Sequence, residues 1–243
     1  MKRLFDILVS AAGLLGGSVV LLPTMFLVWL QDRHSPFYIA PRMARSGGTF
    51  RMVKLRSMRI LADKTGVTST AGDDPRITAV GRFIRKFKLD EVTQLWNVLK
   101  GDMSLVGPRP QVEADARLYT EVERRMLDVR PGITDLASIV FADEGEILRG
   151  SANPDLRYNQ VIRPWKSRLA LLYVDGRPGI ATDIRIVKLT ALAITNRQAA
   201  LRGASELVAE LGGDEELRRI ALREAPLREA PPPGATAVVQ SLA

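Results

Sequence analysis

The longest apolar run of the chain lies near its start, where residues 7–30 contain no charged side chain. At about 1.5 Å per residue, a helix of this length reaches across a hydrocarbon core about 30 Å thick. Lys2 and Arg3 precede the run and more basic residues follow it, so the positive-inside rule favours the cytoplasm for both ends. Pro23 lacks a backbone N–H and should kink or break the helix. The pattern allows either a re-entrant membrane helix that bends at Pro23 or a single-pass anchor with a kink.

The segments that follow predict a small extended element and then mostly helices. Apolar side chains near alternation around Gly47 predict strand or extended structure over residues 35–60. The polar residues 61–76 predict a surface loop. Residues 77–88 place apolar side chains at helical spacing with arginines and lysines elsewhere, which is typical of an amphipathic interfacial helix. Similar patterns and stop signals predict helices over residues 90–100, 112–129, 164–174, 180–195 and about 199–223.

These segments together predict an α+β fold that is mostly helical, with a small β or extended element in one compact domain. A chain of 243 residues can bury one good core but leaves little room for two large domains. We expect four parts: a membrane-anchoring re-entrant helix over residues 1–34, a cytosolic domain over 35–195, a charged helix over 196–223 and a disordered tail over 224–243. The last assignment rests on the prolines of the tail.

Composition narrows the chemistry. The chain has no cysteine and one histidine, His34, which excludes thiol nucleophiles and cysteine-ligated metal centres and leaves little scope for histidine catalysis. The net charge of +8 fits nucleic acid, an anionic membrane surface or phosphorylated substrates equally well. The basic residues are scattered through apolar segments and form no nucleic-acid recognition motif. This distribution favours a membrane surface and argues against nucleic acid as a partner.

Two short motifs are candidates for phosphate chemistry. Asp90 and Glu91 are adjacent carboxylates at a predicted helix start, closely preceded by Arg85, and hard oxygen ligands of this kind suit Mg²⁺. The alternative is an acidic helix start that merely favours the helix dipole. Arg109 lies between Pro108 and Pro110, which restrict its backbone and could position its guanidinium for a phosphate. It could equally be a surface arginine, and Lys54 and Arg56 are similarly ambiguous.

The order of the motifs resembles a known family. The run Leu89–Pro110 closely resembles the signature of the bacterial sugar transferases called monotopic phosphoglycosyl transferases. The segments Lys2–Asp6, Lys54–Met58 and Arg130–Thr134 also look like motifs of that family, in the same order. The resemblance covers about residues 1–195 and includes no multi-pass N-terminal region, as in a minimal catalytic form.

The resemblance implies a reaction and a location. Asp90 would attack the β-phosphate of a UDP-sugar and release UMP, and polyprenyl phosphate would then accept the sugar phosphate. The enzyme would begin the assembly of an exopolysaccharide, capsule, O-antigen or glycoprotein glycan. It would work at the bacterial inner membrane, with a re-entrant helix in the lipid and its active site on the cytoplasmic face, and it could form a homodimer.

The resemblance also implies roles for single residues. Glu91 and Mg²⁺ would assist Asp90, and Arg109 within Pro108-Arg109-Pro110 would contact the nucleotide. Arg85 and either Lys54 or Arg56 would balance phosphate charge. Asp183 resembles a further active-site acid. The chain departs from the family at Leu22, where relatives often carry serine, and at Asp135, where they often carry glycine, which could mark a different sugar subgroup.

Two other readings stay open at this point. A glycosyltransferase with a lipid acceptor would release UDP instead of UMP and would need no covalent aspartate. A non-catalytic membrane scaffold of an envelope assembly complex would also explain the basic amphipathic helices. The identity of the nucleotide product separates these readings, and the dependence of function on Asp90 separates the enzymes from the scaffold.

Overall fold

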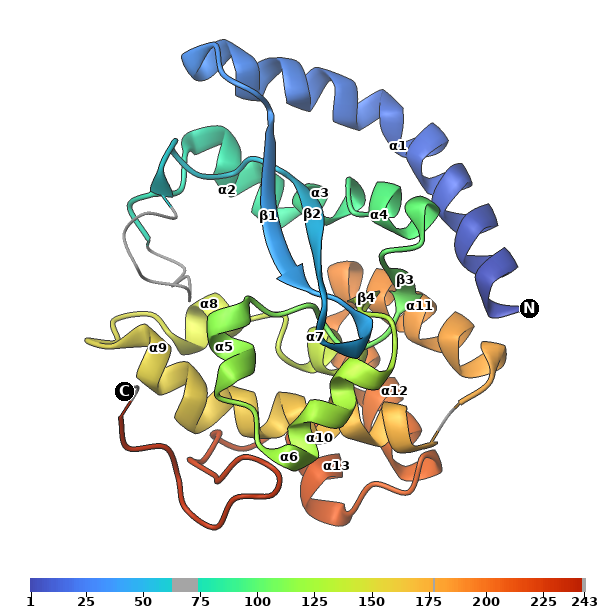
Figure 1. The fold of residues 1–243 in the computed structure, drawn as a ribbon, viewed down its shortest axis with the longest axis vertical. Helices are drawn as coiled ribbons and strands as arrows, with labels where there is room; N and C mark the ends of the chain where they lie inside the picture. Colours follow the sequence, from blue (N-terminus) through green and yellow to red (C-terminus); the bar gives the residue numbers. More distant parts are fainter. Residues whose placement is uncertain (63–73, 177, 242–243) are drawn as a thin grey trace.

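The computed structural model describes residues 1–62, 74–176 and 178–241. It is a mostly helical α+β fold with two small sheets and one long apolar helix at the N-terminus, as predicted. Figure 1 shows that helix, α1, arching over one side of the molecule, with the short helices of residues 79–100 next to it. The two longer strands run away from α1 toward the opposite side, where most of the later helices are packed. Most of the predicted loop over residues 61–76 lies outside the described residues.

Helix α1 (Lys2–Asp32) continues through Pro23 and ends where Arg33 adopts a left-handed conformation. The expected break at Pro23 is therefore not seen in the helix. A proline removes only one backbone hydrogen bond, and the turns on either side keep theirs, while the Thr24 hydroxyl donates to the Val20 carbonyl at 2.7 Å. Figure 1 shows the bend spread along α1 as an arc.

The two sides of α1 differ in their surroundings. Leu21 and Val28 are buried against Leu55 of strand β2 (Thr49–Leu55) and Ile84 of helix α2 (Ala79–Lys86). The other side exposes a band of large apolar side chains: Leu15, Val19, Val20, Leu22, Phe26, Leu27 and Leu30. By length and composition, α1 is the one helix among the described residues that could cross a membrane. An exposed apolar band of this extent is suited to contact with lipid.

Two strand pairs frame the middle of the chain. β1 (Phe37–Met43) pairs antiparallel with β2 (Thr49–Leu55), with Phe37 opposite Leu55, which confirms the predicted extended element. β3 (Ser104–Val106) pairs in parallel with β4 (Gly132–Thr134). This second pair was not predicted, because each strand is too short to show an alternating pattern. A Cβ on Gly132 would lie 2.2 Å from the Gly107 nitrogen, so glycine is required where the two strands meet.

The predicted amphipathic helix is α2 (Ala79–Lys86), capped by the Thr78 side chain. The helix predicted over residues 90–100 is divided into α3 (Leu89–Val92) and α4 (Leu95–Lys100). The one predicted over residues 112–129 is divided into α5 (Glu113–Arg117), α6 (Glu121–Arg124) and a 3₁₀ turn, because Thr120 is extended and starts a new helix with a capping box.

The core is built mainly by the second half of the chain. Short helices α7 (Leu136–Val140), α8 (Glu144–Ile147) and α9 (Pro154–Arg157) lead through a π-helical turn into α10 (Arg163–Gly176). Helix α11 (Ile180–Thr195) has the predicted bounds. Leu136 and Ile139 of α7 are buried against Leu169 of α10 and Ile186 of α11.

The C-terminal part differs from the prediction in two ways. The charged helix expected over residues 196–223 is divided into α12 (Arg197–Glu210) and α13 (Glu215–Leu222) by a turn at Gly212, whose φ is +86°. The described residues of the tail, 224–241, were expected to be disordered; they form no helix or strand but pack along α10. Ala230 is buried and donates to the Gln160 carbonyl at 3.0 Å, and Trp165 donates to the Arg228 carbonyl at 3.1 Å. Its apolar side chains supply burial that its proline content alone does not reveal.

Candidate active site

The paired carboxylates lie on the short helix α3. Lys88 precedes the helix in a left-handed conformation with φ +55°, so the chain turns sharply out of α2 before Asp90 and Glu91. Helix α3 packs beside β2, and the Asp90 carboxylate lies 3.8 Å from the Lys54 ammonium group of that strand. The Thr93 hydroxyl donates to the Val53 carbonyl at 3.2 Å, which ties the end of α3 to the same strand. The structure thus brings Asp90 together with a cation that is remote in sequence.

Glu91 is paired with Arg109. The Arg109 guanidinium donates to Glu91 Oε1 at 2.7 Å, and both side chains are largely buried. Burial would raise the pKa of Glu91, but the charges of Arg109 and Lys54 outweigh it and lower that pKa to about 2. The same pairing raises the pKa of Arg109. Glu91 is therefore a fixed anion that orients Arg109. The loop that carries Arg109 is itself held against β4, because the Gly132 N–H donates to the Pro108 carbonyl.

Lys54 has an unusual environment for a lysine. Burial lowers its pKa to about 8, and the Arg109 charge acts in the same direction, while Asp90 and Glu91 act against it. The Lys54 side chain is about one-fifth exposed. At neutral pH the group is still mostly protonated, so it adds a positive charge beside Asp90. A partly desolvated cation at this place is suited to bind a phosphate.

Arg85 and Arg56 have different surroundings. Arg85 of α2 donates to the Ser57 hydroxyl at 3.1 Å, and burial lowers its pKa while the nearby Asp90 charge raises it. Its charge therefore interacts with the same carboxylate as that of Lys54. Arg56 instead binds both oxygens of Asp32, at 2.5 and 2.7 Å, at the end of α1. The expected phosphate role for Lys54 or Arg56 is thus compatible with Lys54, while Arg56 fastens α1 to β2.

The hydrogen bonds of the Asp183 side chain are to Lys2 and Tyr173, and not to Asp90 or Glu91. It is buried on α11, where it accepts hydrogen bonds from Lys2 at 2.5 Å and from the Tyr173 hydroxyl at 2.6 Å. Lys2 also donates to the Val106 carbonyl at 3.2 Å. The expected active-site acid is therefore part of the contact that holds the start of α1, a role that a short sequence match could not distinguish from catalysis.

The carboxylates offer only a partial metal site. Among the residues that the structure describes, no three aspartate, glutamate or histidine side chains are grouped as metal ligands. Glu91 is engaged by Arg109, which leaves the Asp90 carboxylate as the available ligand. Mg²⁺ commonly uses one or two carboxylates together with substrate phosphates and water. The donor set thus fits a Mg²⁺ that arrives with a diphosphate.

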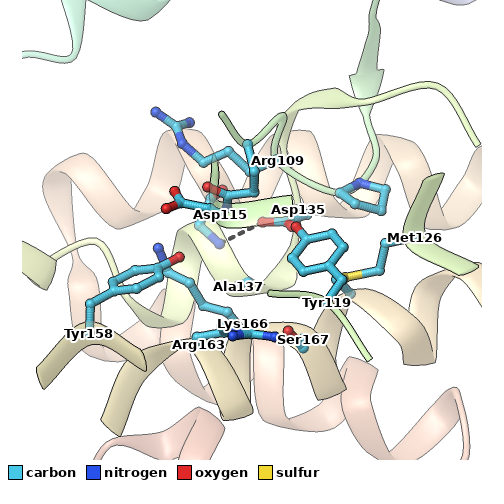
Figure 2. Close-up of a pocket in the computed structure, with 14 residues that line it drawn as sticks. Arg109, Asp115, Tyr119, Met126, Asp135, Ala137, Tyr158, Arg163, Lys166 and Ser167 are labelled. Atoms are coloured by element: carbon cyan, nitrogen blue, oxygen red, sulfur yellow. Dashed lines mark hydrogen bonds between the residues drawn. The ribbon is translucent and has the colours of Figure 1, made fainter. Parts of the chain in front are cut away.

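A pocket under Arg109 was not predicted. Figure 2 shows Arg109 above it, Asp115 and Asp135 within it, and the rings of Tyr119 and Tyr158 on opposite sides. Lys166 of α10 pairs with Glu144 of α8 and lies over the Tyr158 ring. No spacing rule connects α5, α7, the π-helical turn that carries Tyr158, and α10. The one available signal in the sequence was Asp135, which departs from the residue that the family usually carries there. Asp135 caps α7 by accepting a hydrogen bond from the Ser138 N–H at 2.6 Å.

Comparisons of sequence find similar bacterial proteins. The family model described as bacterial sugar transferase matches residues 1–197. The exopolysaccharide production protein ExoY of Sinorhizobium fredii is 38% identical over an alignment of 153 residues that covers 57% of this chain and 68% of that protein. The uncharacterized sugar transferase EpsL of Bacillus subtilis is 42% identical over 139 residues, with the same coverages. The undecaprenyl-phosphate galactose phosphotransferase of Salmonella typhimurium is 40% identical over an alignment of 154 residues that covers 56% of this chain and 32% of that longer protein.

Proposed function

This chain belongs to the bacterial sugar transferase family, and on that basis we propose that it transfers a sugar-1-phosphate from a UDP-sugar to a polyprenyl phosphate and releases UMP. The name of the Salmonella relative includes both a lipid phosphate and a phosphotransfer. The observation that carries the proposal is the Asp90 carboxylate, held 3.8 Å from Lys54 and next to the Glu91–Arg109 pair. The product would be the first lipid-linked intermediate of an exopolysaccharide or related glycan.

In the first step, an oxygen of the Asp90 carboxylate attacks the phosphorus that carries the sugar. A bond forms between that oxygen and the phosphorus, and the bond from the phosphorus to the bridging oxygen breaks. UMP leaves with the electron pair, and the sugar phosphate stays on the enzyme as an acyl phosphate. In the second step, a phosphate oxygen of the lipid attacks the same phosphorus, which releases Asp90 and forms a lipid diphosphate sugar. One phosphate site thus serves a soluble donor and a lipid acceptor in turn.

The positive side chains explain how one anion can approach another. A carboxylate and a diphosphate repel each other, and this repulsion must be offset before attack. Lys54 and Arg85 lie on the Asp90 side and Arg109 on the Glu91 side. Glu91 accepts from Nη2 of Arg109, and the Ile133 carbonyl accepts from Nη1 at 3.4 Å, which leaves the remaining N–H groups of the guanidinium to donate to phosphate oxygens. A Mg²⁺ held by Asp90 with the diphosphate would add charge neutralisation and polarise the phosphoryl oxygens.

The membrane contact follows from α1. Its exposed apolar band would lie in lipid, and the same helix is fastened to β2, which carries Lys54, through Asp32 and Arg56. The phosphate site would then lie close to the membrane surface, where the head group of a polyprenyl phosphate lies. We assign the site to the cytoplasmic face of the inner membrane, since UDP-sugars are cytoplasmic substrates.

The test is the identity of the released nucleotide. The full chain in detergent is incubated with Mg²⁺, undecaprenyl phosphate and one UDP-sugar at a time, and UMP and UDP are measured. We expect UMP from the wild type with at least one donor and a loss of more than about 1,000-fold in Asp90→Asn. Asp175→Asn, which changes an exposed carboxylate paired with Arg125, is the matched control and should keep wild-type rates.

A second measurement isolates the covalent step. Without lipid acceptor, the wild type should release a burst of UMP equal to the enzyme concentration, and a peptide containing Asp90 should gain the mass of the sugar phosphate. Release of UDP would instead indicate a glycosyltransferase. UMP release that survives in Asp90→Asn would rule out the proposed nucleophile.

A further inference from the structure

The pocket under Arg109 contains a carboxylate without a partner. Asp115 lies on α5, and among the described residues its side chain has no hydrogen bond and no ion pair within 4 Å. Burial, with the Asp155 charge acting in the same direction, raises the pKa of Asp115 to about 6, so the group is ionised at neutral pH. A partly buried carboxylate that lacks a donor has unused capacity to accept hydrogen bonds from a ligand.

The walls of the pocket combine these acceptors with aromatic rings. Asp135 supplies a second buried carboxyl group, and the rings of Tyr158 and Tyr119 face the space from opposite sides (Figure 2). A pyranose has hydroxyl donors around its edge and apolar C–H faces, so it complements carboxylates and aromatic rings together. A uracil ring has one N–H donor beside its two carbonyl acceptors, so it would leave most of the acceptor capacity of the two carboxyl groups unused. The chemistry of the walls therefore favours a sugar over the base.

The position of the pocket links it to the phosphate site. Arg109 both lines the pocket and donates to Glu91 at 2.7 Å, and Glu91 follows the proposed nucleophile directly in the chain. Lys166, which lines the pocket on the α10 side, forms an ion pair with Glu144. A phosphate bound between Asp90 and Arg109 would thus have this pocket beside it.

We propose that the pocket under Arg109 binds the sugar ring of the donor, with Asp115 accepting hydrogen bonds from ring hydroxyls and so selecting the sugar. This inference rests on the proposed function, because it takes the bound phosphate to be the one that carries the sugar. Asp115 is then a specificity-determining residue of the transfer reaction.

The test compares Asp115→Asn with Glu113→Gln. Both change a carboxylate of α5 to an amide, but Glu113 is exposed and paired with Arg117 outside the pocket. For each protein, kcat/KM for UMP release is measured with UDP-glucose, UDP-galactose and their N-acetylated counterparts, and the inhibition constant of UMP is measured in parallel. The ratio of kcat/KM between two sugars and the UMP inhibition constant do not depend on the fraction of folded enzyme.

We expect Asp115→Asn to lower kcat/KM for the preferred donor, and its ratio to a poorer donor, by about 10-fold or more. The inhibition constant of UMP should stay within about twofold, because UMP lacks the sugar. Glu113→Gln should match the wild type. An unchanged sugar ratio in Asp115→Asn, or an equal weakening of UMP, would overturn the sugar assignment while leaving the transfer reaction intact. A wild type that releases no UMP from any donor would overturn the proposed function and this inference with it.

Discussion

Basic side chains that lie close together in the sequence have different roles in this protein, and the contacts of each side chain determine its role. Lys54 and Arg56 are two positions apart, yet Lys54 lies beside Asp90 whereas Arg56 binds Asp32. Burial, reinforced by Arg109, lowers the pKa of Lys54 to about 8, against the opposing effect of Asp90 and Glu91. Its positive charge is therefore present below about pH 8 and is lost above it. The charge available to a bound phosphate thus depends on pH near the physiological range.

The pH dependence of UMP release tests this role of Lys54. In the wild type, kcat/KM, which reports the free enzyme, should fall about tenfold per pH unit well above pH 8 as Lys54 loses its proton. Lys54→Arg should keep its rate to a higher pH, because an arginine stays protonated there. Lys100→Arg changes an exposed lysine paired with Asp102 and serves as the control. An unaltered falling limb in Lys54→Arg would assign the titration to another group.

At the scale of elements, the start of α1 is fastened by polar contacts. Arg3 donates to the Val98 and Leu99 carbonyls at the end of α4, at 2.5 and 2.8 Å. Asp6 is buried and accepts from the Ser104 hydroxyl at 2.9 Å and the Leu105 N–H at 3.1 Å. Lys2 binds Asp183 on α11. The first turns of the apolar helix are thus fixed to the globular part.

The Asp6 contact makes a stability prediction. Asp6→Ala leaves the Leu105 N–H and the Ser104 hydroxyl buried without an acceptor, which should cost about 1–3 kcal/mol of unfolding free energy. Thermal melting in detergent measures the loss, with Asp175→Ala as an exposed control expected to change stability by less than about 0.5 kcal/mol. Equal melting of Asp6→Ala and the wild type would mean that water or another group replaces Asp6.

At the scale of the whole molecule, Arg223, which lies beyond the residues matched by the family model, contacts the segment between α7 and α8. Asp143 lies 2.9 Å from Arg197 of α12 and 3.0 Å from Arg223, which follows α13. Arg223 also lies over the Phe141 ring. The next residue, Glu144, pairs with Lys166 at the pocket under Arg109. The C-terminal helices therefore hold the segment between α7 and α8 in place.

Arg223→Met tests this connection. The substitution removes one of two cations bound to Asp143, and we expect a loss of about 1–2 kcal/mol in stability together with faster proteolysis after residue 196. Arg219→Met changes an exposed arginine of α13 paired with Glu215 and should behave as the wild type. Limited trypsin digestion and thermal melting measure both effects. Identical digestion of the two variants would show that the C-terminal helices are held by apolar packing alone.

Local sequence patterns were sufficient for the features that depend on neighbouring residues. The absence of charge over residues 7–30 predicted the long apolar helix, and alternation around Gly47 predicted the β1–β2 pair. The bounds of α11 follow from its periodicity. Asp90, Glu91 and Arg109 were identified from their motif, and the structure brings all three into one region. These features depend on interactions that recur within a few residues along the chain.

Only the tertiary structure decided which distant groups meet. It paired Arg56 with Asp32, placed Asp183 against Lys2, and assembled the pocket of Asp115 and Tyr158 from separate helices. It also kept α1 continuous through Pro23 and packed the tail on α10. Whether a charge is buried or paired depends on groups far away in sequence, and no local pattern encodes their distances. For the same reason, the sequence indicated the reaction chemistry, while the arrangement of the helices determined where a sugar could bind.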